Sequence, residues 1–104
     1  MSTARLETFR TMVSRQPDHA MARFGLATEL AKLGQHAEAT EHFAQYLAMH
    51  DDEGNGWLRY AECLHAIDRT DDARAAIGRG IDAATRHSHA TLVADLEALQ
   101  DSFE

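Results

Sequence analysis

The sequence predicts an all-α protein built as a stack of antiparallel helical hairpins, and three observations lead to this fold class. Apolar residues make up 44% of the 104 residues but aromatic residues only 7%. Much of the apolar content is alanine, the best helix former. Pro17 is the only proline, and runs of β-branched residues are few, so strands are poorly supported. The chain is also similar to itself at a spacing of 34 residues.

The repeat is visible in the residues that this spacing brings together. They match in size class and fall at helical intervals within each half of the unit. The matched pairs are Leu26 with Tyr60, Ala27 with Ala61, Leu30 with Leu64, Ala39 with Ala73, and Phe43 with Ile77.

The first unit, residues 20–53, is expected to contain two helices. The first runs roughly over 18–33, with Asp18 as its N-cap after Pro17 and Gly34 as the left-handed residue that ends it. The second helix runs over about 36–49. We expect it to bury Ala37, Phe43 and Leu47.

The second unit, residues 54–87, follows the acidic run 51–53, whose carboxylates favour a helix N-terminus. Its second helix begins near Thr70, which offers a capping oxygen before the first-turn carboxylates of Asp71 and Asp72. The apolar residues of its two helices are Trp57, Tyr60, Ala61, Leu64 and Ile67 in the first, and Ala73, Ile77 and Ile81 in the second.

This pattern resembles the tetratricopeptide repeat (TPR), which has large, apolar and small residues at fixed places in two helices. The second unit supplies Trp57, Tyr60, Ala61, Leu64, Ala73 and Ile77 at these places, and the first supplies Leu26, Ala27, Leu30, Ala39 and Phe43. The resemblance implies a short right-handed superhelix of about six helices. It also implies a concave groove, lined by the first helix of each unit, that binds an extended peptide or a helix.

The chain departs from the family pattern at four places. Arg23 stands where a large apolar residue is expected, Asp51 and Thr85 stand at the proline position, and Gly80 replaces a usual alanine. The first departure leaves open a helix register shifted by two residues, using Met21, Phe24 and Gly25. We prefer the unshifted register because it preserves the 34-residue period.

Both ends of the chain fit the same scheme, so we expect a single domain over residues 1–104. Residues 3–16 form a leading half-repeat helix that buries Leu6, Phe9 and Val13. Residues 88–104 form a capping helix with an apolar stripe of Leu92, Leu96, Leu99 and Phe103. The leading half-repeat leaves an exposed apolar edge, which suggests self-association.

The resemblance implies a function in protein–protein interaction, and helical geometry predicts which residues of each unit's first helix face the groove. The predicted partner-binding residues are Met21, Phe24 and Thr28 in the first unit, and Asn55, Leu58, Arg59, Glu62 and His65 in the second. Phe24 and Leu58 would be apolar anchors and Arg59 a partner for a carboxylate. Two plainer interpretations remain open: Phe24 packs on the N-terminal helix, and Arg59 and Glu62 are ordinary solvated residues.

Composition excludes several classes of partner. The net charge of −7 argues against nucleic acid and anionic membranes, which are negative themselves. No signal core or apolar stretch long enough for a membrane span is present, so we expect a soluble, cytoplasmic protein.

Cys63 is the only cysteine, which excludes an intramolecular disulfide, and its helix position predicts a buried, inert thiol. With no catalytic motif, neither enzyme activity nor a cofactor is expected.

Two competing functions remain. One is a self-associating structural subunit that uses its end helices. The other is a helical metal-binding protein, suggested by the seven histidines. His87 and His89 flank Ser88, and His42 lies four residues from Glu38, but no zinc-type spacing is present. Isolated surface histidines explain the same residues, and His65 at an interface would respond to pH.

Overall fold

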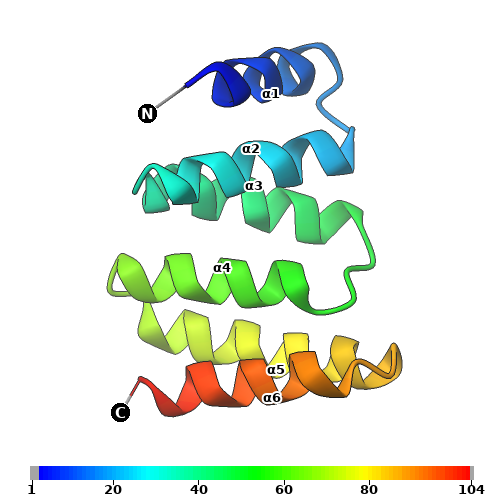
Figure 1. Ribbon diagram of the computed structural model, residues 1–104, viewed down its shortest axis with the longest axis vertical. Helices are drawn as coiled ribbons and strands as arrows, with labels where there is room; N and C mark the ends of the chain where they lie inside the picture. The colour runs from blue at the N-terminus through cyan, green and yellow to red at the C-terminus, as the bar shows by residue number, and fades with distance from the viewer. Residues whose placement is uncertain (1–2, 104) are drawn as a thin grey trace. The chain divides into compact units, whose positions relative to one another are not determined.

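A computed structural model of the chain describes residues 3–103, which contain six α-helices and no strand. The helices are α1 (Ala4–Arg15), α2 (Ala20–Lys32), α3 (His36–Met49), α4 (Asn55–Ala66), α5 (Thr70–Arg86) and α6 (Ala90–Asp101) (Figure 1). Within each half of the chain, residues 3–50 and 51–103, short turns join successive helices, which therefore run in opposite directions. The all-α fold class of helical hairpins is confirmed.

The six helices form two compact units, which we call unit 1 (residues 1–50) and unit 2 (residues 51–104). Each unit consists of one helical hairpin and one further helix. In unit 1 the hairpin is α2–α3, and α1 packs on α2. In unit 2 the hairpin is α4–α5, and α6 packs mainly on α5. The further helix thus precedes the hairpin in one unit and follows it in the other.

The core of unit 1 settles the register of α2. Met21 is 54% exposed, whereas Arg23 is only 7% exposed, so the unshifted register is correct. The apolar side chains buried in this unit are Leu6, Ala22, Leu26, Ala27, Leu30, Ala39, Phe43 and Tyr46. Of the three residues expected to be buried in α3, Phe43 is buried and Leu47 half-buried. The expectation for Ala37 is wrong, because Ala37 lies on a different side of α3 from the stripe of Ala39, Phe43 and Tyr46 and is exposed.

Gly25 allows α1 to approach α2 closely. A Cβ atom at this position would overlap the ring of Phe9, well inside van der Waals contact. Phe9 and Val13 are half-buried and Leu6 is buried, so the predicted apolar face of the first helix is turned inward. The opposite side of α1 is largely polar.

The core of unit 2 joins all three of its helices. Its buried residues are Ala61, Leu64, Ala73, Ala76, Ile77, Ala84 and Leu96. The rest of the predicted C-terminal stripe packs on this core as half-buried side chains, namely Leu92, Leu99 and Phe103. Gly80, a departure from the family pattern, has a packing role. A Cβ atom there would lie 2.8 Å from the Cβ of Trp57 and 3.1 Å from Leu96.

The turns that end the first helices repeat the 34-residue period. Gly34 has the predicted left-handed backbone, with φ of 79°. Asp68, 34 residues later, has φ of 62° although it is not a glycine. In both turns the next residue donates its backbone N–H across the helix end, Gln35 to Leu30 and Arg69 to Leu64. This is the hydrogen bond of a Schellman-type helix end.

Two predicted helix starts need correction. His19, not Asp18, caps α2, because the Nδ1 atom of His19 accepts the backbone N–H of Ala22. Thr70 is the first residue of α5 rather than its cap, and its hydroxyl lies against His65 instead.

The acidic run before α4 acts as expected. The carboxylate of Asp52 is buried and accepts the backbone N–H groups of Gly54 and Gly56, both at 2.8 Å. It satisfies donors that a helix N-terminus otherwise leaves unpaired.

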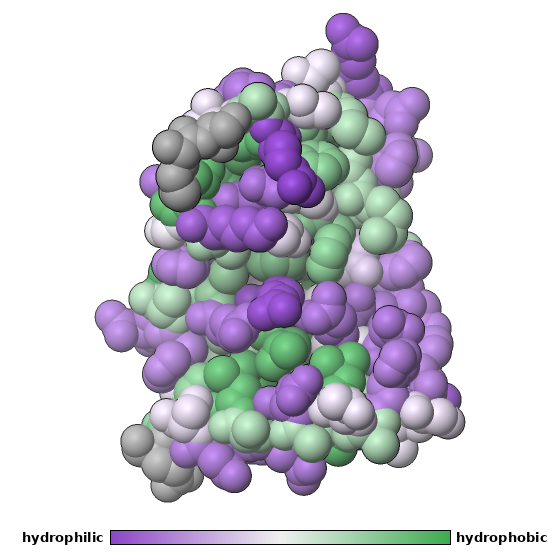
Figure 2. All heavy atoms as spheres, in the orientation of Figure 1, coloured by the Kyte–Doolittle hydropathy of each residue, from purple (hydrophilic) through white to green (hydrophobic). Residues whose placement is uncertain are grey.

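The face of the protein drawn in Figure 2 mixes polar side chains with apolar patches. Among residues 3–103, the large hydrophobic side chains that are exposed are all methionines of unit 1, namely Met12, Met21 and Met49.

Candidate functional site

One side of α2 carries the three residues predicted for unit 1, but they are not equally accessible. Met21 is the most exposed large hydrophobic residue in the described part of the chain. Thr28 is half-buried, and its hydroxyl donates to the carbonyl of Phe24 at 2.8 Å. Met21 therefore offers free apolar surface, while the Thr28 hydroxyl is already engaged as a donor.

Phe24 forms part of an aromatic cluster inside the hairpin. Its ring centroid lies 4.9 Å from that of Tyr46 and 5.9 Å from that of Phe43, in tilted and edge-on arrangements. These geometries are the favourable ones for aromatic pairs. Phe24 is half-buried and packs on α3, a neighbour different from the N-terminal helix that the sequence suggested. Part of the Phe24 side chain remains accessible to a ligand.

The outer face of α4 carries the predicted residues of unit 2. Asn55 and Leu58 are half-buried, and Leu58 packs on the unit 2 core. Arg59 and Glu62 are exposed and pair with each other at 3.1 Å. An exposed ion pair of this kind contributes little to stability, so its charges remain ready for other partners.

His65 continues this face towards the end of α4. Its ring stacks on Phe103, with the centroids 4.2 Å apart, and its Nδ1 atom lies 3.0 Å from the hydroxyl oxygen of Thr70. The segment after α6 therefore covers one side of the His65 ring.

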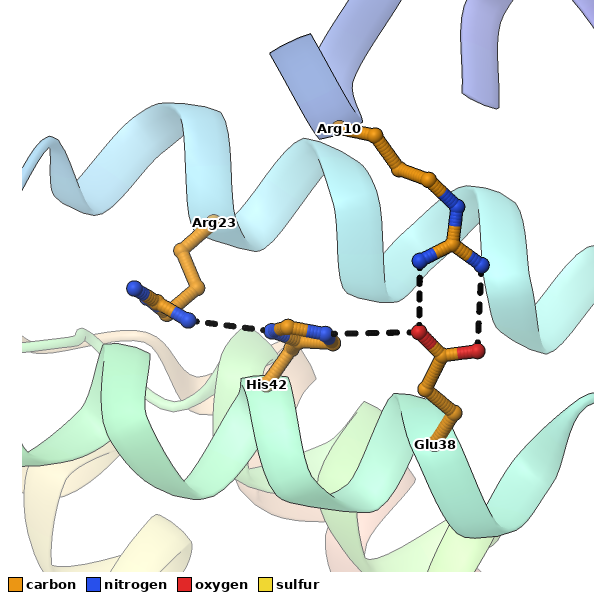
Figure 3. A network of polar contacts seen from close by, with 4 residues as sticks. All are labelled: Arg10, Arg23, Glu38 and His42. Atoms are coloured by element: carbon orange, nitrogen blue, oxygen red, sulfur yellow. Dashed lines mark hydrogen bonds and ion pairs between the residues drawn. The ribbon is translucent and has the colours of Figure 1, made fainter. Parts of the chain in front are cut away.

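Four residues of unit 1 form a polar network that the sequence revealed only in part (Figure 3). Arg10 of α1 donates both terminal nitrogens to the carboxylate of Glu38 on α3, at 2.6 and 3.1 Å. The same carboxylate lies 3.7 Å from Nε2 of His42. The Nδ1 atom of His42 lies 3.0 Å from one terminal nitrogen of Arg23, and the other terminal nitrogen of Arg23 donates to the carbonyl of Pro17 at 2.8 Å. Spacing along α3 indicated the Glu38–His42 pair, but no sequence signal indicated the two arginines.

The network shifts the pKa values of its acidic and basic members. The hydrogen bonds from Arg10 hold the pKa of Glu38 below its ordinary value, and Glu38 in turn raises the pKa of Arg10. Burial is the largest cause of a lowered pKa for His42, and the charge of Arg23 adds to it. Glu38 opposes this shift without reversing it.

Cys63 is buried at 2% exposure, as predicted. Burial raises the pKa of its thiol to about 11, and the nearby charge of Glu62 contributes. Because the thiolate is the nucleophilic form, this thiol is unreactive at neutral pH.

The histidines near the α5–α6 turn pair with carboxylates at the start of unit 2. His87 lies 3.5 Å from Asp51, and His89 lies 3.0 Å from Glu53. Within residues 3–103, no three histidine, cysteine or acidic side chains lie together in a way that would hold a metal ion.

The charge of the protein is divided unevenly between the two units. Residues 1–50 contain five basic and five acidic residues, whereas residues 51–104 contain five basic and twelve acidic residues. Unit 1 is therefore formally neutral, and unit 2 carries the whole net charge of −7. None of the helices described is long and apolar enough to cross a membrane.

Comparisons with known proteins agree with the repeat seen in the helices. A family model described as tetratricopeptide repeat matches residues 30–96, which is more than half of the chain. A search of curated proteins found no match. Members of this repeat family are generally protein–protein interaction modules and typically act as scaffolds rather than enzymes. The match and the helical hairpins together establish that the chain belongs to the tetratricopeptide repeat family.

Proposed function

We propose that the chain binds a peptide or a helix of a partner protein in the concave groove typical of its family. The first helices of the two hairpins, α2 and α4, would each contribute one face. The observation that carries this proposal is the exposed side chain of Met21 on the outer face of α2, together with the repeat family itself. A flexible, polarisable methionine side chain adapts to differently shaped apolar partners.

The face of α4 supports the same role with polar chemistry. Arg59 and Glu62 are exposed, and each has a charge that a partner can engage when their mutual pair opens. Asn55 and Leu58 lie beside them with part of each side chain accessible. The proposed partner therefore supplies an apolar residue for Met21 and a carboxylate for Arg59.

The uneven charge adds a preference for the partner's composition. Unit 2 carries an excess of seven acidic residues, so it attracts a partner segment with basic residues and repels an acidic one at long range. The segment that we propose is therefore basic overall, with a single carboxylate near Arg59.

Self-association through the end helices has less support. The exposed side of α1 is mainly polar and charged, with Met12, 37% exposed, as its one large apolar side chain. The exposed side of α6 combines alanines with Asp95, Glu97 and Asp101. Identical acidic faces repel each other, so this surface does not favour a second copy of the chain.

The proposal is tested with a double variant, Met21→Glu with Arg59→Glu. Both side chains are exposed, so the variant is expected to keep its helical circular dichroism signal and its thermal midpoint. Partners captured by the wild-type chain from its native lysate would be identified by mass spectrometry, purified, and titrated against both proteins. We expect the variant to bind at least about tenfold more weakly, because exchanged charges and a lost apolar contact remove more than 1.4 kcal/mol.

A matched control is available in the same chain. Met49→Glu with Arg74→Glu changes an exposed methionine and an exposed arginine that pairs with an acidic residue three positions away, as Arg59 does. These residues lie on α3 and α5, so the control should bind as the wild type does. Equal binding by wild type and test variant would reject the proposed faces. If the wild-type chain captures only itself, self-association becomes the better function.

A further inference from the structure

We propose that Arg10, Arg23, Glu38 and His42 form an acid-sensitive latch. Protonation of His42 breaks its contact with Arg23 and so weakens the packing of α2 on α3. All four residues belong to unit 1, and they join its three helices (Figure 3). This inference is independent of the partner-binding role.

The contacts of His42 determine where its proton lies. Arg23 has only donor groups, so the Nδ1 atom facing it at 3.0 Å has to be an acceptor. A neutral imidazole with an unprotonated Nδ1 carries its hydrogen on Nε2. That nitrogen faces the carboxylate of Glu38. The neutral ring therefore links an arginine and a carboxylate with one acceptor and one donor.

Protonation of His42 removes the acceptor at Nδ1. The new hydrogen on Nδ1 points at the guanidinium group of Arg23, so two donors and two positive charges oppose each other. Arg23 has no room to turn away in the folded unit, because it is 7% exposed and its other terminal nitrogen is held by the Pro17 carbonyl. Its Nε atom already lacks a hydrogen-bond partner among the described residues. Losing His42 as an acceptor leaves Arg23 held by Pro17 alone.

The charged groups that face His42 come from every helix of the unit. They are Arg23 of α2, Glu38 of α3 and, behind Glu38, Arg10 of α1. Arg10 engages Glu38 through two hydrogen bonds, so much of the carboxylate charge is committed before it can stabilise an imidazolium. The arrangement therefore favours the neutral ring.

The sign of the pH effect follows from this preference. The folded unit lowers the pKa of His42, so the unfolded chain binds the proton more readily. The contribution of His42 to stability is complete above the ordinary histidine pKa of about 6.5. It is lost as the pH falls from there towards the lower folded value. The lowered pKa of Glu38 acts in the same direction at more acidic pH, below the ordinary carboxylate range.

The experiment compares amide hydrogen exchange at about pH 7.5 and about pH 5.5, corrected for intrinsic rates, in the full chain. In the wild type, protection of amides in α2 and α3 should fall severalfold at the lower pH. In His42→Gln, which keeps an acceptor but cannot be protonated, this fall should disappear. His50→Gln, at the exposed end of the same helix, should behave as the wild type does. An equal fall in His42→Gln would overturn the proposal.

A second measurement does not depend on the folding of that variant. The ring signals of His42, followed by NMR in the wild type, should titrate below the ordinary histidine range. In Arg23→Met the midpoint should move upward, because the opposing charge is gone. A wild-type midpoint at or above the ordinary range, or one that does not move in Arg23→Met, would show that Arg23 and His42 are not coupled as proposed.

Discussion

Arg23 of unit 1 and Trp57 of unit 2 occupy equivalent positions, 34 residues apart, in the first helices of their hairpins. The residues on the second helices also differ between polar and apolar. His42 faces Arg23 in unit 1, and the residue of unit 2 that is equivalent to His42 is the buried Ala76. Trp57 packs on the apolar core of unit 2 and lies against the guanidinium of Arg79, 5.1 Å from the ring centroid. One hairpin thus fills these two positions with a hydrogen-bonded polar pair, and the other fills them with a tryptophan and a buried alanine.

The further helices show a parallel difference. Each unit uses a glycine to admit a side chain from its further helix, but the glycine lies on opposite arms of the two hairpins. In unit 1 it is Gly25 of α2, which lies under the ring of Phe9. In unit 2 it is Gly80 of α5, which lies between Trp57 and Leu96. The same 34-residue pattern therefore packs against a helix that precedes or follows the hairpin. A glycine on the first helix of the hairpin makes room for a preceding helix, and a glycine on the second makes room for a following one.

The largest effect is expected from breaking the polar pair of unit 1. His42→Ala should lower the free energy of unfolding by about 2 kcal/mol, because a buried, charged donor loses an acceptor. The double variant Arg23→Met with His42→Ala copies the apolar solution of unit 2. Since it also removes the buried charge, it should be more stable than His42→Ala alone. Urea unfolding at neutral pH measures both values.

The control for this comparison is Arg23→Met alone. The three variants complete a double-mutant cycle, and residues in direct contact are expected to be non-additive by about 1 kcal/mol. If the two single costs simply add, the two side chains do not depend on each other, and the comparison with Trp57 and Ala76 loses its meaning.

A smaller effect is expected at the glycine of unit 2. Gly80→Ala should lower the free energy of unfolding by about 1–2 kcal/mol, because the new methyl group lies 2.8 Å from the Trp57 Cβ, an atom that cannot move without its backbone. Gly78→Ala, two residues earlier on the same helix, meets nothing within 4 Å. It should raise stability by up to about 1 kcal/mol through helix propensity. Thermal unfolding of both variants gives the contrast.

Gly25→Ala extends the test to unit 1. Its methyl group would meet the far end of the half-buried Phe9 ring, which can turn aside, so the loss should be smaller than for Gly80→Ala. A larger loss at Gly25 would mean that α1 is held more rigidly than α6.

Much of this fold could be predicted from sequence because it follows from a local period. The repeated apolar and small residues specified the hairpins, and the stripe of Leu92, Leu96 and Leu99 specified the last helix. Helix caps were harder, since the choice between Asp18 and His19 depends on the backbone angles of single residues. A side chain on either residue can accept the first-turn N–H groups.

The 34-residue repeat could not predict the polar network of Arg10, Arg23, Glu38 and His42. Arg23 interrupts the repeat, so in the sequence it suggests a shifted register rather than a buried charge. Its partners, the carbonyl of Pro17 and the ring of His42, come from a loop and another helix. Contacts between different helices also decide how accessible the predicted binding residues are. Phe24 is half-buried and packs on Phe43 and Tyr46, whereas Met21 is 54% exposed.

The smallest effect is expected at the turns, where the two units are most alike. Gly34 and Asp68 both adopt a left-handed backbone and precede the same helix-ending hydrogen bond. A side chain makes this conformation costly, by roughly 1–2 kcal/mol for most residues and by less for aspartate. Asp68→Gly should therefore raise the free energy of unfolding by about 0.5 kcal/mol, and Gly34→Asp should lower it by a similar amount.

Asp68→Ala serves as the control and should lower stability, because alanine lacks the local hydrogen bonding that helps aspartate tolerate this backbone. Thermal midpoints in the order glycine, aspartate, alanine at position 68 would show that backbone conformation controls this turn. A stability loss in Asp68→Gly would show instead that the Asp68 carboxylate matters more to unit 2 than its strained backbone does.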